Sequence, residues 1–93
     1  MNPQAFEAQL QAAGYSPAVE VQRPAGYGLE THQHPFDAWA LVTAGSITLV
    51  VDGVATRYSV GDMFRLPAGT PHLESAGPEG VTYFSGRREA AAS

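Results

Sequence analysis

Residues 26–34 read Gly26-Tyr-Gly-Leu-Glu-Thr-His32-Gln-His34, and residues 61–72 read Gly61-Asp-Met-Phe-Arg-Leu-Pro-Ala-Gly-Thr-Pro-His72. These two segments contain all three histidines of the chain. Side chains alternate between the faces of a β-strand, so His32 and His34 are expected to share one face. A third imidazole, from His72 on a strand across a barrel, would complete a facial set with open positions for water or substrate. The spacing therefore predicts one metal site at His32, His34 and His72.

This spacing resembles the two sequence motifs of the cupin superfamily. The first motif is matched by Gly26, His32, His34 and Gly45, but Ala38 stands where the family usually has a glutamate. The second is matched by Gly61, Pro67, Gly69 and His72, with Ala76 where asparagine is common. The resemblance covers roughly residues 26–76. It implies an all-β fold, a double-stranded β-helix or jelly-roll barrel, with a metal site. It does not imply one reaction, because cupins include dioxygenases, isomerases, lyases, decarboxylases, storage proteins and sugar sensors.

Composition limits the classes of partner. The chain has 93 residues, which suits a single domain, and its nine acidic residues outnumber its five arginines. A net charge of −4 without a basic cluster argues against nucleic acid. No apolar run approaches the roughly 18 residues that cross a membrane, and the first residues lack the pattern of a secretory signal. With no cysteine, we expect a cytoplasmic protein without a cysteine-based zinc site.

A short helix is expected over residues 3–13. Asn2 suits the N-cap, Pro3 the first helical position and Gly14 the residue after the end. Phe6, Leu10 and Ala13 are spaced to form one apolar stripe, which would dock on the barrel or on a partner subunit.

Residues 19–86 are expected to form the barrel, and residues 87–93 a flexible tail in which Arg87 and Arg88 are solvated. Asp52-Gly53 predicts a two-residue hairpin turn, and Gly45-Ser46 a further turn. Eight short antiparallel strands of this kind favour a double-sheet jelly roll with room for one small ligand. The strands are expected at Val19–Arg23, Gly28–Gln33, Ala38–Thr43, Ser46–Val51, Val54–Ser59, Asp62–Leu66, His72–Ser75 and Val81–Gly86.

Acidic residues near the histidines are candidates for a direct role. Glu30 shares strand parity with His32 and His34, and Glu74 shares it with His72, so either could act as fourth ligand or as general acid or base. The competing interpretation places such acids at the rim, hydrated or paired with arginine. Asp37 lies beside the position of the missing glutamate, but the register places Ala38 on the metal side.

Three neutral imidazoles would leave the full +2 charge of an ion uncompensated, which favours anionic, chelating substrates. The resemblance to three-histidine cupins implies a dioxygenase using Fe(II), although Zn, Ni, Mn or Cu would also accept imidazoles. The leading hypothesis is a metal-dependent enzyme, of dioxygenase or isomerase/lyase type, acting on a small anionic or oxygen-rich molecule. The alternative is a non-catalytic cupin module that binds or senses a small molecule, and a third is a metal-free barrel. A homodimer is expected, since a barrel of this size gains core by burying an edge strand.

Overall fold

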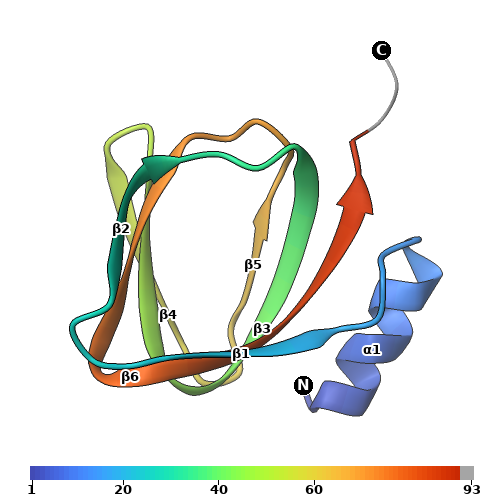
Figure 1. Ribbon diagram of the computed structural model, residues 1–93. Coiled ribbons are helices and arrows are strands. Elements are labelled where there is room, and N and C mark those ends of the chain that lie inside the picture. Colours follow the sequence, from blue (N-terminus) through green and yellow to red (C-terminus); the bar gives the residue numbers. More distant parts are fainter. Residues whose placement is uncertain (91–93) are drawn as a thin grey trace.

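Two long bent strands, β3 (Phe36–Val51) and β6 (His72–Glu89), form the frame of the molecule. The structure is a computed structural model, and it describes residues 1–90. The remaining elements of this part of the chain are α1 (Pro3–Ala12), β1 (Val19–Arg23), β2 (Gly28–His32), β4 (Val54–Ser59) and β5 (Met63–Leu66). Figure 1 shows the strands curling around a common interior, with α1 outside the barrel.

Each long strand takes part in two sheets, and all pairings are antiparallel. The first half of β3 lies between β5 and the last part of β6, which in turn pairs with β1. The second half of β3 lies between β4 and the first part of β6, which pairs with β2. The two sheets therefore share β3 and β6, and their inner faces enclose the core. This arrangement confirms the expected jelly-roll barrel.

The start of β3 is buried on both faces, which explains its run of apolar residues. Ala38, Ala40 and Val42 point into the barrel core with Phe64 and Leu66 of β5. The alternate residues, Trp39 and Leu41, point outward and are covered by Phe6 and Leu10 of α1 together with Tyr15. Phe6 and Tyr15 contact the Trp39 indole edge-on, with ring centroids 5.5 and 5.6 Å away. The helix thus completes a second small core outside the barrel.

The helix begins as the sequence predicts. The Asn2 side chain accepts a hydrogen bond from the Ala5 N–H at 2.8 Å, and Pro3 is the first helical residue. Phe6 and Leu10 are fully buried, so the stripe docks on the chain's own barrel. At ten residues, the one helix within residues 1–90 is too short to span a membrane.

The prediction of eight strands was wrong, because two pairs of them are continuous. Residues expected at Ala38–Thr43 and Ser46–Val51 belong to β3, and those at His72–Ser75 and Val81–Gly86 belong to β6. Gly45 is not a turn between strands. It lies in a bulge of β3, at φ +66°, where the register with β6 shifts on either side. The bend moves the strand from one sheet to the other without ending it. The hairpin at Asp52-Gly53 is confirmed, with Val51 paired to Val54 and both turn residues at positive φ.

Candidate metal centre

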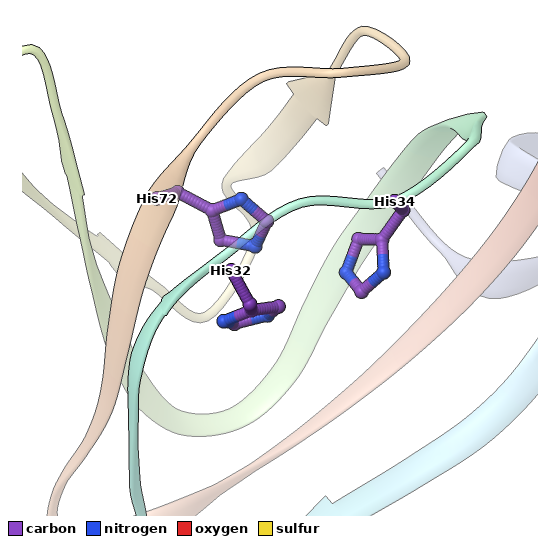
Figure 2. Close-up of side chains that lie close together, drawn as sticks. All are labelled: His32, His34 and His72. Atoms are coloured by element: carbon purple, nitrogen blue, oxygen red, sulfur yellow. The ribbon is translucent and has the colours of Figure 1, made fainter.

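The three histidines converge on one side of the barrel interior. His32 and His72 are cross-strand partners of β2 and β6, and His34 follows β2 before β3 begins. The ring centroid of His32 lies 4.2 Å from that of His72 and 5.0 Å from that of His34. One nitrogen of each ring lies within 4.8 Å of the others. Figure 2 shows the three rings gathered around one space, with His72 approaching from β6.

Backbone carbonyls fix which nitrogen of two rings carries hydrogen. Nδ1 of His32 donates to the Glu30 carbonyl at 2.8 Å, and Nδ1 of His72 donates to the Thr70 carbonyl at 2.9 Å. In the neutral imidazole the Nε2 atom then carries a bare lone pair. Both Nε2 atoms are buried and have no hydrogen-bond partner. The two rings are therefore held in the tautomer and orientation that a metal ligand requires.

A carboxylate faces the same two nitrogens. Oε1 of Glu74 lies 3.1 Å from Nε2 of His32 and 3.7 Å from Nε2 of His72, and its side chain is 10% exposed. With a neutral ring whose hydrogen is on Nδ1, the 3.1 Å approach brings two lone pairs together, whereas a protonated ring would form an ion pair with the carboxylate. Oε2 of Glu74 accepts a hydrogen bond from the Tyr27 hydroxyl at 3.3 Å. A shared cation would turn this repulsion between acceptors into attraction.

These residues fit a divalent ion. Neighbouring ligands of an ion with bonds of about 2.0–2.2 Å lie roughly 3.0–3.4 Å apart, and Glu74 Oε1 already stands at that distance from His32 Nε2. The ligand nitrogens of the three histidines all lie within 4.8 Å of one another. Orphaned buried nitrogens, a nearby carboxylate and fixed tautomers together satisfy what such an ion needs.

A cavity of about 510 Å³ opens beside the cluster. Burial raises the pKa of Tyr83 to about 12, and burial also raises the pKa of Tyr27. Both phenols are therefore protonated near neutral pH and can donate hydrogen bonds. Burial, followed by the neighbouring His32 and His72, lowers the pKa of His34, so its ring is neutral at pH 7. The wall includes Val19, Val21, Arg23, Tyr27, Leu29, Phe36, Ala38, Leu49, Phe64, Leu66, Glu74, Tyr83, Ser85 and Arg87.

Of the acidic candidates, the structure brings only Glu74 to the cluster. The side chain of Glu30 is exposed and does not line this cavity, whereas its neighbour Leu29 does. The register of β2 against β6 shifts between Leu29 and His32, which interrupts the alternation used to place Glu30 beside the histidines.

Asp37 points away from the cavity, as its register predicts, and Ala38 lines it. The Asp37 carboxylate accepts a hydrogen bond from the Ala68 N–H at 2.8 Å and pairs with Arg88 at 3.0 Å. The Ala68 N–H, followed by Arg88, lowers the pKa of Asp37. Its role is to tie β3 to β6 and to the segment after β5.

Sequence reasoning missed the two arginines near the end of β6. The expectation of a flexible tail from residue 87 was wrong for them, because β6 continues to Glu89, although both side chains are exposed as expected. Arg88 bonds to Asp37 and to the Ala13 carbonyl, while Arg87 lines the cavity. Alternation from Tyr83 and Ser85 would have placed Arg87 on the cavity side if the predicted strand had continued past Gly86. The rest of the predicted tail, residues 91–93, lies outside the described part of the chain.

Comparison with known proteins agrees with this architecture. The cupin domain model matches residues 19–83. A protein of unknown function from Streptococcus pyogenes has a TM-score of 0.70 and 22% identity, over 82% of this chain and 66% of that one. KdgF from Halomonas sp. has a TM-score of 0.64 and 29% identity, over 76% of this chain and 68% of that one. The DMSP lyase DddQ from Ruegeria pomeroyi has a TM-score of 0.66 and 25% identity, over 83% of this chain and 40% of that one.

This chain thus spans less than half of DddQ and about two thirds of the other two structures. No curated protein matches the sequence significantly. The family match extends over more than half of the residues and includes His32, His34 and His72. On this match and the barrel topology, the chain belongs to the cupin domain family.

Proposed function

We propose that the protein is a metal-dependent enzyme that holds one divalent ion through His32, His34 and His72. The observation that carries this proposal is the pair of buried Nε2 atoms of His32 and His72, which have no hydrogen-bond partner although each Nδ1 does. Leaving a buried polar atom unsatisfied costs about 1–3 kcal/mol, and a bound ion removes that cost. A divalent ion supplies Lewis-acid stabilisation of negative charge on a substrate oxygen, and iron also supplies redox chemistry.

Glu74 is the acidic ligand in this proposal and replaces the glutamate that the first motif lacks at Ala38. Its Oε1 faces the histidine nitrogens, and the hydrogen bond from Tyr27 to Oε2 orients the carboxylate. Three neutral imidazoles and one carboxylate reduce the +2 charge of the ion to +1. That remaining charge favours a substrate that approaches with one anionic or strongly polarised oxygen.

Among the described residues that line the cavity, the groups with basic lone pairs are the histidines and Glu74, and in this first candidate reaction all of them serve as ligands of the ion. Tyr27 and Tyr83 remain protonated, so they bind and orient substrate oxygens by donation. This inventory favours chemistry that needs no separate protein base. We therefore propose an oxygenase with Fe(II), acting on a small anionic or oxygen-rich molecule. Zn, Ni, Mn or Cu would fit the same ligands.

A second candidate is an isomerase- or lyase-type reaction, which one contact favours. Oε2 of Glu74 faces away from the histidines toward Tyr27, so it can accept a proton from a carbon next to a substrate carbonyl. The C–H electron pair then moves toward the carbonyl oxygen, giving an enolate, and the proton resides on Glu74. The similarity to a lyase, DddQ, at 25% identity also supports this candidate.

The two reactions are distinguished by their need for oxygen. The protein should be purified without an affinity tag, reconstituted separately with each metal and offered acetylacetone and related diketones. Oxygen consumption with the Fe(II) form supports the oxygenase. Solvent deuterium uptake at the substrate carbon without oxygen supports proton transfer. A ligand that binds tightly and is released unchanged would instead favour a binding or sensing module.

Glu74→Gln should lower the affinity for Zn²⁺ by roughly 10- to 100-fold, the range found for groups that tune a metal site. The substitution keeps the size of the side chain and its contact with Tyr27 but removes the charge. Competition with a chromophoric chelator gives the affinity. Glu30→Gln is the matched control, because that side chain lies outside the cavity, and its affinity should not change. An unchanged affinity in Glu74→Gln would remove Glu74 from the ligand set.

The metal-free protein should lose stability as the pH falls from 7 through about 6.5. The pKa of His34 is lowered in the folded state, so the unfolded chain takes up its proton first and protons favour unfolding. Urea denaturation at a series of pH values measures this dependence. His34→Gln should flatten the slope in this window, and a slope that is the same in both proteins would contradict the assignment.

A further inference from the structure

The cavity holds two arginines in very different settings. Arg23 is near one end of the β1–β6 pair, opposite Val81, and lies 5.3 Å from the centroid of the Tyr27 ring. Arg87 lies on β6 itself, six residues after Val81 and on the same inner face, opposite Ala38 of β3. With about 3.3 Å per residue, the two arginine backbones are roughly 20 Å apart. Contacts connect the histidine cluster to both arginines: Tyr27, beside Arg23, bonds to Glu74, and Phe36, beside Arg87, stacks on His34.

Arg87 is connected to the cluster by one aromatic ring. Its guanidinium carbon lies 4.3 Å from the centroid of Phe36, and the Phe36 ring stacks on His34 at 4.9 Å with an interplanar angle of 15°. Phe36 therefore fixes the place of both side chains. The backbone of Arg87 is also held, because its N–H donates to Ser16 Oγ and its carbonyl accepts from the Ser16 N–H. Arg87 is therefore an exposed residue at the cavity wall whose guanidinium is positioned by these contacts.

The neighbouring arginine shows what a structural role looks like. Arg88 points to the other side of the strand, where it pairs with Asp37, bonds to the Ala13 carbonyl and stacks on Tyr15. Arg87 has no carboxylate partner among the ion pairs of residues 1–90. Its stacking on Phe36 uses the face of the guanidinium and leaves the N–H edge free for a planar oxyanion.

We propose that Arg87 is the specificity-determining residue of the cavity and binds a carboxylate of the substrate while another oxygen of the same molecule reaches the histidine cluster. This inference rests on the proposed function and narrows its substrate class to carboxylic acids that carry a second, metal-seeking oxygen group. The charges favour a dianion: the site retains +1 after Glu74 is counted, Arg87 adds +1, and Arg23 adds a further +1 at the other end of the cavity. The cavity of about 510 Å³ accommodates a small acid of this kind.

The test uses hydroxamates, which chelate metals, in pairs that differ only at the far end. Succinic and glutaric monohydroxamate carry a carboxylate there, and butyro- and valerohydroxamate of the same lengths carry a methyl group. Titration calorimetry on the zinc-loaded protein should show at least one acid binding about 5- to 10-fold more tightly than its neutral partner. Arg87→Gln should remove this preference while leaving the affinity of the neutral hydroxamates unchanged. Arg87→Lys keeps the charge but lacks the planar guanidinium that donates two parallel hydrogen bonds, so it should retain part of the preference for the acids.

Arg57→Gln is the matched control, because it removes the same charge from the exposed strand β4, outside the cavity, and should keep the full preference. No preference in the native protein, or an equal one in Arg87→Gln, would overturn the proposal. A preference lost in Arg23→Gln but kept in Arg87→Gln would also overturn it. A measurement without metal separates this inference from the metal site: in metal-free protein, succinate should shift the Arg87 Nε–H NMR signal, and an unmoved signal would count against it.

Discussion

Replacing His72 by alanine should abolish stoichiometric metal binding. The native protein is expected to bind one divalent ion per chain, and metal at about 100 times its dissociation constant stabilises a folded protein by about 2.7 kcal/mol. For a domain of this size, 1 kcal/mol shifts the melting temperature by about 4–8 °C. Saturating Zn²⁺ should therefore raise the melting temperature of the native protein by roughly 10–20 °C and leave that of His72→Ala nearly unchanged. Metal analysis after gel filtration and thermal unfolding with and without Zn²⁺ measure both effects.

His72 is only 1% exposed, so its loss also removes packing, and a second variant separates the two effects. His32→Ala changes a ring that is 25% exposed and should disturb the fold less while abolishing the same metal response. Circular dichroism of the metal-free variants shows whether the barrel is intact. If either folded variant still binds one ion per chain with an unchanged melting shift, the three-histidine site is disproved.

Gly45→Ala should be among the most destabilising single changes in the barrel. Gly45 has φ +66°, and a Cβ built there would overlap the Gly80 carbonyl oxygen of β6. The left-handed backbone alone costs a residue with a Cβ about 1–2 kcal/mol. The overlap with backbone cannot be relieved by turning a side chain, so β3 and β6 must separate at their bend. We expect a total loss of several kcal/mol, comparable to the roughly 5 kcal/mol that stabilises a small domain.

Gly53→Ala is the control for this prediction. Gly53 has φ +76° in the β3–β4 turn, but nothing lies within 4 Å of a Cβ built there. It should therefore lose only the backbone contribution, about 1–2 kcal/mol. Urea denaturation of both variants and the native protein gives the comparison. Equal losses at the two glycines would show that the close approach of Gly80 is tolerated.

Local sequence signals were sufficient for the elements that depend on local chemistry. The cap at Asn2, the turn at Asp52-Gly53 and the bounds of β1 and β4 follow from residue types whose preferences act over a few positions. The motif spacing also gave the barrel and brought His32, His34 and His72 to one side of it.

Features that depend on pairing between distant strands could not be predicted in this way. Glycines near residues 45 and 80 look like turn signals, yet β3 and β6 pair with each other on both sides of them, with a shift of register, and continue as single strands. The shift in β2 that turns Glu30 away from the cavity and the three extra residues of β6, which place Arg87 at its wall, have the same origin. Only the tertiary register decides which face such a residue occupies.

The pairing of Phe36 with Glu89 determines when this protein can fold. During synthesis, the early part of β3 leaves the ribosome some fifty residues before its partner on β6, so the sheet that contains β1 and β5 cannot close until Glu89 has been made. Contacts between such distant residues slow folding to the millisecond-to-second range typical of β-rich domains. Until then the apolar residues of β3 are uncovered, and the newly made chain depends on rapid completion to escape aggregation.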